Sequence, residues 1–334
     1  MFVSKRMLET AEKNNPKVSI IVPVHNAGNR LVKCLDTLIN QTLREIEIIL
    51  VLDCPTDGSE RIAEEYAAKD DRIVILKNTE NLHIGKSRNR GLEMAHGEFI
   101  GFSDHDDYRE LTMYEELYAE ATEKKADVVL SLLENDKNLK EDFVRYGDIV
   151  YSKDFILKDL IGFGYENNPG ALFVRVTGNL YKKSLLKSNR INFVDTLTTT
   201  PEDVIFQIKS IIRSENLALI KKQLYFHQKH TDNEGIKGSY VSFEKRGEGM
   251  EEIYSFLISE KVYDYFRDYF YKGVTKQFLN ALAGTVYPKF SISQFVRAVK
   301  HLRSYPFCKK AFAVYSLPPA KHNWLRMLLV KMLK

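Results

Sequence analysis

Residues 17–53 read KVSIIVPVHNAGNRLVKCLDTLINQTLREIEIILVLD, and this stretch decides the fold class. It opens with the β-rich run 17–26, which ends in turn-prone residues, and it closes with the apolar run 46–53. Between the two runs, apolar side chains recur at helical spacing on one face, made of Leu31, Cys34, Leu35, Leu38 and Ile39. A strand, a helix and a second strand in this order predict a βαβ unit with two parallel strands.

The same alternation continues as far as residue 133. Further strands are predicted at 72–78, 98–104 and 126–133, with helices over 56–69, 85–97 and 111–125. We therefore expect an α/β fold with a mostly parallel central sheet flanked by helices. Ligands of such sheets bind at the carboxyl ends of the strands, where Asp53 and Asp104 follow apolar runs.

Three carboxylates crowd the end of the fourth strand, in the stretch SDHDDY at 103–108. Because like charges repel and resist burial, Asp104, Asp106 and Asp107 need compensation. They are suitable ligands for a Mg²⁺ or Mn²⁺ ion that neutralises a nucleotide diphosphate. They also suit a solvated turn in which Asp107 is stabilised by the dipole of the next helix. Neither G-x-G-x-x-G nor G-x-x-x-x-G-K-[ST] occurs, so a nucleotide would bind without a glycine-rich phosphate loop.

Charge is distributed unevenly along the 334 residues. The net charge is +4, yet no acidic residue follows Asp268, and the last 66 residues hold twelve Lys and Arg. The first 268 residues carry 37 basic and 45 acidic groups, a net charge of −8. This asymmetry favours a polyanionic partner for the basic end, a membrane surface or a nucleic acid. No recognition motif accompanies the charge, so we expect no nucleic-acid binding.

The location of the protein is also predicted from composition. No apolar run approaches the ~20 residues that span a bilayer, and residues 1–15 lack the apolar core of a secretory signal. Cys34, Cys54 and Cys308 have no metal-site spacing and form an odd set, which favours a reducing compartment. We expect a cytoplasmic protein.

The pattern loosens after residue 134. A helix is predicted again over 198–213, where Thr200 can cap the helix and Pro201 suits its first position. From about residue 243 the chain reads as mostly helical. We expect a main domain over 1–240, with halves 17–134 and 135–240, and a helical basic region over 241–334.

The motifs at 18–59 and 81–108 together resemble the family 2 glycosyltransferases of the GT-A fold. The resemblance implies a metal-dependent, inverting transfer of a hexose from a nucleotide diphosphate sugar, most often a UDP-sugar, to a glycan acceptor. Residues 17–134 would then bind the nucleotide and 135–240 the acceptor. The acceptor would belong to cell-surface polysaccharide synthesis, and a lipid-linked acceptor would explain a membrane contact.

The same resemblance assigns residues to the donor site. It places the nucleoside against the end of the first strand. It places the diphosphate or the base near Arg88, which with Asn89 matches an Arg-Asn motif. It assigns ribose contact to Asp104, the metal to Asp106 and support of Asp106 to Asp107, while Gly91 permits close helix packing. The positions implied in nucleotide binding are Pro23, Val24, His25, Asn26, Asp53, Arg88, Asp104, His105 and Asp106.

Two of these positions depart from the family pattern. His25 stands where the family usually has Tyr, so stacking on the base is weaker or different. Asp53 is followed by Cys54 and Pro55 and preceded by Leu52, so that one of two paired carboxylates is kept. Asp53 is therefore the candidate for bonding the base, and its alternative role is to cap the turn. His105 occupies a variable position and is given no metal role.

The resemblance also assigns the chemistry of the acceptor. TPEDV at 200–204 matches the family's Glu-Asp pair, with Asp203 as the general base and Glu202 orienting the acceptor. Acidic residues are favoured at helix starts by the dipole alone, which is the alternative interpretation. His227 and His230 follow a strand-like run, where some family members close a loop over the donor. Either imidazole could then reach the diphosphate or the metal, although surface histidines without a ligand are more common.

The last residues form an amphipathic pattern. KHNWLRMLLVKMLK at 321–334 separates an apolar stripe from basic side chains, as in helices that lie in a membrane surface. The alternatives are a helix docked on its own domain or a contact in an oligomer, whose state stays open. Two rival functions also remain. One is a catalytically silent protein that binds nucleotide-sugars or acts as a membrane scaffold; the other is a sugar-1-phosphate nucleotidyltransferase.

Overall fold

The structure is a computed structural model that describes residues 15–133, 152–163, 174–228, 243–282, 296, 299–314 and 331. Two compact units interleave along the chain. The first comprises 1–147, 175–196 and 209–229, and the second comprises 148–174, 197–208 and 230–334. The boundary expected at residue 240 stays a prediction.

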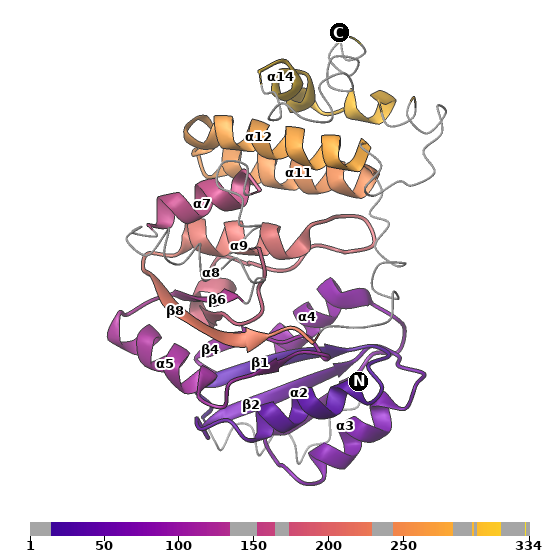
Figure 1. Cartoon of the computed structure of the whole chain (residues 1–334), viewed down its shortest axis with the longest axis vertical. Helices are drawn as coiled ribbons and strands as arrows, with labels where there is room; N and C mark the ends of the chain where they lie inside the picture. The colour runs from indigo at the N-terminus through magenta and orange to yellow at the C-terminus, as the bar shows by residue number, and fades with distance from the viewer. Residues whose placement is uncertain are drawn as a thin grey trace. The chain divides into compact units, whose positions relative to one another are not determined.

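The first unit is built on a mixed sheet (Figure 1). Within the described residues, the strand order is β3-β2-β1-β4-β7-β6-β8-β5. The strands are β1 (Val18–Val24), β2 (Ile46–Leu52), β3 (Ile73–Lys77), β4 (Phe99–Phe102), β5 (Tyr108–Arg109), β6 (Val128–Leu133), β7 (Leu180–Lys182) and β8 (Leu217–Phe226). Every residue of β1 and β2 is buried, as their near-continuous apolar sequences predict.

Parallel pairing is confirmed for the first four predicted strands. β1 pairs in parallel with both β2 and β4, and β3 pairs in parallel with β2. The fifth predicted strand, β6, does not join β4, because the short strand β7 lies between them, antiparallel to both. β8 then pairs in parallel with β6, and β5 closes the edge in antiparallel orientation. The sheet is therefore mostly parallel, with antiparallel pairings confined to β7 and β5.

Helices cover both faces of this sheet. The helices α2 (Arg30–Ile39), α3 (Ser59–Ala67) and α5 (Met113–Glu123) bury apolar side chains in one core cluster with the alternate residues Val18, Ile20, Val22 and Val24 of β1. The helix α4 (His83–Met94) lies on the opposite face (Figure 1). A Cβ on Gly91 would overlap the Ile21 side chain, so the expected close packing of this helix on β1 is confirmed. The short α8 (Lys183–Ser188) follows β7.

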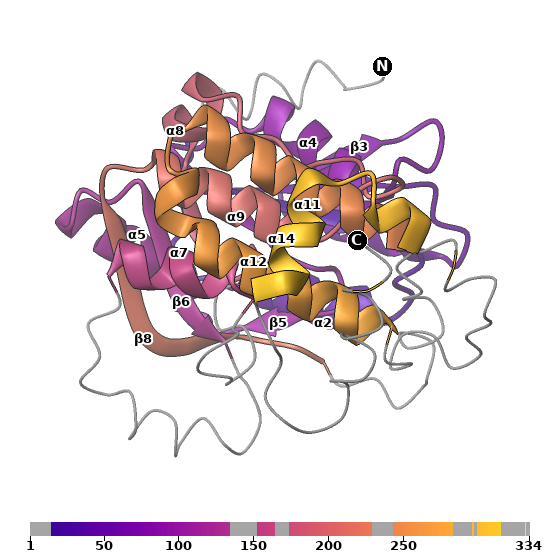
Figure 2. The ribbon, with the colours of Figure 1, turned by 90° about the horizontal axis from the view of Figure 1, so that it is seen from above.

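The second unit is helical where the structure describes it. Its helices are α7 (Lys153–Ile161), α11 (Phe243–Ser259), α12 (Tyr263–Leu282) and α14 (Pro306–Val314), and it shares α9 (Glu202–Arg213) with the first unit. α12 packs against α7, α11 and α14, and Figure 2 shows α14 lying over α12. Tyr254, Phe270 and Phe307 form an aromatic cluster at these contacts. The expected helical character after residue 243 is confirmed for these ranges.

The start of α9 differs from its prediction by one residue. The helix begins at Glu202, and the Pro201 carbonyl accepts the Ile205 N–H at 3.2 Å. Pro201 therefore stands where Thr200 was expected, just before the first helical residue.

None of the helices in the described ranges is both long enough and apolar enough to cross a bilayer.

Candidate functional site

The carboxyl ends of β1, β2 and β4 meet at one edge of the sheet. The Asp53 N–H donates to the Val24 carbonyl at 2.8 Å, and His25 Nδ1 donates to the Asp53 carbonyl at 2.6 Å. His105 Nδ1 donates to the Pro23 carbonyl at 3.1 Å. These bonds gather the residues expected around the nucleoside, and they leave the imidazole of His25 exposed.

Polar side chains join the loops that follow β1 and β2. Asn26 Oδ1 accepts the Thr56 N–H at 2.8 Å. The Ser59 hydroxyl accepts the N–H groups of Ala27 and Gly28 at 3.0 and 2.9 Å, and Asp57 Oδ1 in turn accepts from Ser59. The first of these loops is therefore held in place by hydrogen bonds from the second.

Asp53 has a structural role at the end of β2. Its carboxylate is buried, and Oδ1 accepts Asn78 Nδ2 at 2.6 Å and the Leu82 N–H at 2.7 Å. It thereby ties the end of β2 to the segment after β3 and to the start of α4. Oδ1 therefore stabilises the turn after β2, as the alternative interpretation of Asp53 expects. A hydrogen bond between the base and Oδ2 stays a prediction.

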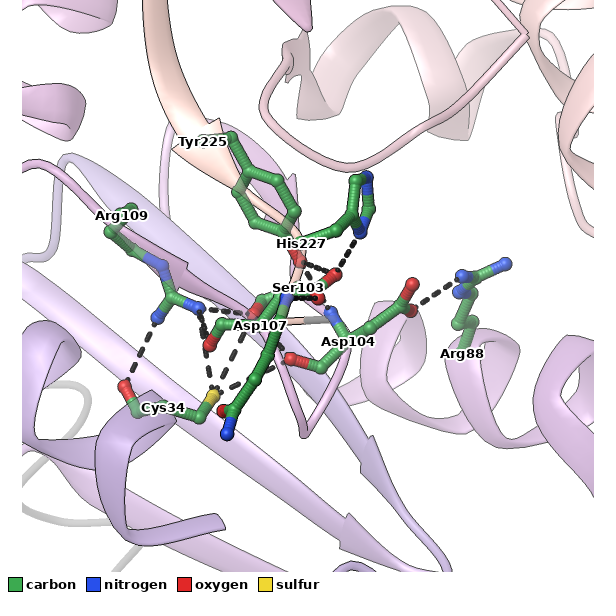
Figure 3. A network of polar contacts seen from close by, with 9 residues as sticks. Cys34, Arg88, Ser103, Asp104, Asp107, Arg109, Tyr225 and His227 are labelled. Atoms are coloured by element: carbon green, nitrogen blue, oxygen red, sulfur yellow. Dashed lines mark hydrogen bonds and ion pairs between the residues drawn. The ribbon is translucent and has the colours of Figure 1, made fainter. Parts of the chain in front are cut away.

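Arg88 compensates the first aspartate of the cluster (Figure 3). Its side chain is 2% exposed, and Nη2 donates to Asp104 Oδ1 at 3.1 Å. The guanidinium also lies 5.0 Å from the ring centroid of Phe193. The buried guanidinium therefore balances the charge of a partly exposed carboxylate at the carboxyl end of β4.

The charge of Asp107 is compensated by residues 225–228, which lie more than a hundred positions after β5 in the sequence. Its Oδ2 accepts the Tyr225 hydroxyl at 2.9 Å and lies 2.8 Å from His227 Nδ1, while Oδ1 accepts the Gln228 N–H at 3.2 Å. The Tyr225 hydroxyl also accepts the Asp104 N–H at 3.0 Å. Burial, with the charges of Asp104 and Asp107, raises the pKa of Tyr225 well above its usual range, so the phenol stays protonated and donates.

A buried arginine supports the aspartate turn from beneath. Arg109 Nη2 donates to the Asp107 carbonyl at 3.0 Å and to the Ser103 hydroxyl at 2.8 Å, and Nη1 donates to the Cys34 carbonyl at 3.3 Å. Figure 3 shows Arg109 and Cys34 on one side of the turn and Arg88 on the other. Burial raises the pKa of the Cys34 thiol, so this sulfur is neutral beside the guanidinium. The crowded carboxylates thus have a cation on each side.

Asp106 is the third carboxylate of this turn, and it is partly buried. Among the described residues, no three His, Cys, Asp or Glu side chains converge as a complete metal site. Within the part of the chain that the structure describes, the buried Nε2 of His227 has no hydrogen-bond partner. An imidazole that donates one nitrogen to a carboxylate and keeps the other for a metal is a common arrangement in metalloproteins.

Asn89 has a role that its motif did not predict. Its side chain donates to the Phe193 carbonyl at 2.9 Å and accepts the Phe193 N–H at 2.8 Å. Lys86 pairs with Asp195 at 2.6 Å on the same segment. α4 thereby holds residues 193–195, which lead toward α9.

Glu202 and Asp203 form the partly buried first turn of α9, within the second unit. His230 and nearly all of the amphipathic stretch 321–334 lie outside the described residues. His227 lies against Asp107.

Sequence reasoning missed Tyr225 and Arg109. Both are polar groups in otherwise strand-like runs, Tyr225 two positions before His227 and Arg109 two positions after Asp107. A polar side chain at a buried strand position next to a charged cluster is the signal that could have found them.

The chain was compared with known proteins. Residues 19–176 match the family model described as glycosyl transferase family 2. The glycosyltransferase GlyG of Streptococcus pneumoniae is 30% identical over 218 residues, which cover 62% of this chain and 71% of GlyG.

Two solved structures show the same fold. S. aureus TarS in complex with UDP-GlcNAc matches with a TM-score of 0.70 at 22% identity, over 95% of this chain and 87% of TarS. The mannosyltransferase PcManGT from Pyrobaculum calidifontis, in complex with GDP-Man and Mn²⁺, matches with a TM-score of 0.52 at 13% identity, over 98% of this chain and 90% of that chain. The expected GT-A architecture with a helical C-terminal part is confirmed.

The relatives are not all of this length. The chain spans only 30%, 61% and 36% of three other curated relatives that it matches.

Proposed function

Because this chain belongs to glycosyl transferase family 2, we propose that it is an inverting glycosyltransferase. It would move a hexose from a nucleotide diphosphate sugar to a hydroxyl of a glycan. The observation that carries the proposal is the aspartate turn at the end of β4, held rigid by Arg88, Tyr225 and Arg109 beside the ends of β1 and β2. A UDP-sugar is the favoured donor, in keeping with the UDP-GlcNAc complex of TarS.

The donor would lie along the edge where the parallel strands end. Residues 23–26 and the free oxygen of Asp53 would contact the nucleoside, and Asp104 the ribose. His105 would line the nucleoside end of the site from its bond to Pro23. Arg88 would approach the diphosphate, since its guanidinium is already fixed at the carboxyl end of β4.

The donor set of this turn fits a divalent cation. Mg²⁺ and Mn²⁺ accept carboxylate oxygens and are commonly held by one or two carboxylates together with substrate phosphates. Asp106 would hold the ion, and the unpartnered Nε2 of His227 is a second candidate ligand, positioned by Asp107. A bound ion would neutralise the charge that develops on the departing nucleotide diphosphate. The Mn²⁺ in the PcManGT complex supports metal use.

The proton of the acceptor hydroxyl would pass to Asp203. In an inverting displacement the hydroxyl oxygen attacks the anomeric carbon from the side opposite the leaving group, and a carboxylate within hydrogen-bond reach accepts its proton. Glu202, adjacent in the first turn of α9, would orient the acceptor.

Separate variants test the donor and acceptor roles. We expect Asp203→Asn to lower transfer by at least a hundredfold and to keep the affinity for UDP, because general-base catalysis contributes typically 10²–10⁴-fold. Asp106→Ala should instead abolish the dependence of UDP binding on Mn²⁺. Titration calorimetry with UDP, with and without Mn²⁺, measures binding, and release of UDP measures turnover across a panel of UDP-, GDP- and dTDP-sugars.

A control variant distinguishes a catalytic role of Asp203 from the general stabilisation of a helix by an acidic residue in its first turn. Asp264→Asn removes an exposed acidic residue from the first turn of α12, so it should leave transfer unchanged. If Asp203→Asn keeps full turnover, the assignment of the base is wrong. If the wild type binds UDP but turns over no donor in the panel, the catalytically silent alternative is favoured, in line with the substitutions at His25, Leu52, Cys54 and Pro55.

The glycan acceptor that we propose belongs to a cell-surface polysaccharide and is carried on a lipid. A membrane contact through the basic end of the chain would bring the enzyme to such an acceptor at the inner face of the membrane.

A further inference from the structure

The start of α9 rests on α11 within the second unit. The Thr200 N–H donates to the Lys245 carbonyl at 3.1 Å. A Cβ on Gly249 would overlap the Thr200 carbonyl oxygen and lie 2.7 Å from the Thr200 carbonyl carbon. Two main chains therefore meet here, and only glycine at position 249 permits this approach.

This contact is one helical turn from the proposed base. Thr200 and Pro201 precede Glu202 and Asp203 directly, and the Pro201 carbonyl accepts the first hydrogen bond of the helix from Ile205. Val204, Ile205 and Phe206 are buried, which fixes the rotation of the helix about its axis. The contact with α11 therefore holds the main chain three residues before Asp203.

Gly249 is unfavourable for the stability of α11, and its contact with Thr200 explains why a glycine occupies this position. A glycine inside a helix makes the helix less stable than an alanine would. Gly249 lies well inside α11, which runs from Phe243 to Ser259. Any side chain at position 249 would push Thr200 away.

We propose that Gly249 is a positioning residue for the transfer reaction, acting through Thr200 on the Asp203 carboxylate. The proposal rests on the proposed function, since it requires Asp203 to be the base. It gives α11 a positioning role in the reaction, because α11 supplies the surface that sets the start of α9.

The test compares two glycine variants of the full-length protein. Gly249→Ala should lower kcat ten- to a hundredfold, since misplacing a catalytic group by about 1 Å costs on that order. The Kd for UDP and the KM for the donor should stay within twofold of wild type. Gly273→Ala is the matched control: its Cβ would overlap the Ile161 carbonyl oxygen, a main-chain clash of the same kind between α12 and α7. At an equal loss of thermal stability, the control should keep its kcat.

Each outcome decides the proposal. Equal kcat values for Gly249→Ala and Gly273→Ala, with Asp203→Asn inactive, would overturn the positioning role and leave the proposed function intact. Turnover by Asp203→Asn would overturn both. If Gly249→Ala does not fold, Met250→Ala replaces it, because shortening this buried side chain lets α11 shift without adding an atom. It should also lower kcat at unchanged UDP affinity and speed amide exchange at Ile205; unchanged kcat would overturn the proposal.

Discussion

Tyr225 shows how a single hydroxyl determines the form of a charged turn. It donates to Asp107 and accepts from the main chain of Asp104, so it bridges the two ends of the turn. Because the side chain is fully buried, no water replaces either bond when the hydroxyl is removed.

We expect Tyr225→Phe to lower the free energy of unfolding by about 1–3 kcal/mol, since the buried Asp107 carboxylate loses a donor and the Asp104 N–H loses its acceptor. UDP affinity should fall as well, because the turn that faces the donor loosens. Chemical denaturation and calorimetry measure the two effects.

The control for this variant is Tyr118→Phe. The Tyr118 hydroxyl bonds Glu98 at 3.1 Å at an exposed position, where water can replace it, so little change is expected. Equal losses of stability in the two variants would contradict the bridging role of Tyr225.

At the scale of elements, α4 connects three parts of the candidate site. Gly91 brings the helix against β1, Arg88 reaches Asp104, and Asn89 holds Phe193. Because Gly91 allows close packing on β1, α4 can contact both the end of β4 and residues 193–195. The sequence motif therefore reflects packing and chain positioning as much as ligand contact.

The contact between α7 and α12 contains a partly buried carboxyl, Asp159, near Lys276. Burial raises the pKa of Asp159 to about 6, against a smaller opposing effect of Lys276, and burial lowers the pKa of Lys276. The Lys276 ammonium donates to the Phe163 carbonyl at 2.6 Å. Both shifts favour neutral forms, so burial outweighs the attraction between the two groups.

This carboxyl should make stability fall as pH rises. Its pKa is higher in the folded protein than in the unfolded chain, so its stabilising effect is complete below about pH 4 and is lost as pH rises through 6. Asp159→Asn should therefore be more stable than wild type at pH 7, by about 2–3 kcal/mol, and equal to it at pH 4. Denaturation at a series of pH values measures this difference. Asp268→Asn, at an exposed position of α12, should show no such trend; a difference for Asp159→Asn that does not change with pH would contradict the assignment.

At the scale of the whole molecule, charge divides the chain unequally. Residues 269–334 carry twelve Lys and Arg and no acidic residue, whereas the rest of the chain has a net charge of −8. Attraction to anionic lipid is about 1 kcal/mol per basic residue near the surface. This charge supports the proposed membrane contact.

We expect the full chain to float with vesicles that contain phosphatidylglycerol and to remain behind with phosphatidylcholine alone, since the attraction is electrostatic. Removal of residues 319–334 should reduce flotation severalfold, and 0.5 M salt should do the same to the full chain, because salt screens exposed charges. A full-length variant in which Lys321, Arg326, Lys331 and Lys334 are replaced by Glu is the control for the length of the chain. Identical flotation of the full and shortened chains would exclude the tail as the contact.

Local patterns were enough to predict much of this protein. The order of strands and helices through residue 133 follows from apolar periodicity, which each segment carries within itself. The edge that gathers Pro23, Asp53, His105 and the aspartates follows too, because parallel strands must bring their carboxyl ends to one side of the sheet.

Only the tertiary structure decided which groups compensate the aspartates. Tyr225 and His227 reach Asp107 from β8, and Arg109 reaches Cys34 across 75 positions, by contacts that leave no period in the sequence. The insertion of β7 between β4 and β6, the second role of Asp53 and the approach of Gly249 to Thr200 are of the same kind. A repeating pattern reports the face that one element buries, whereas the partner of a buried polar group depends on how distant elements pack, and that is settled only when the whole chain folds.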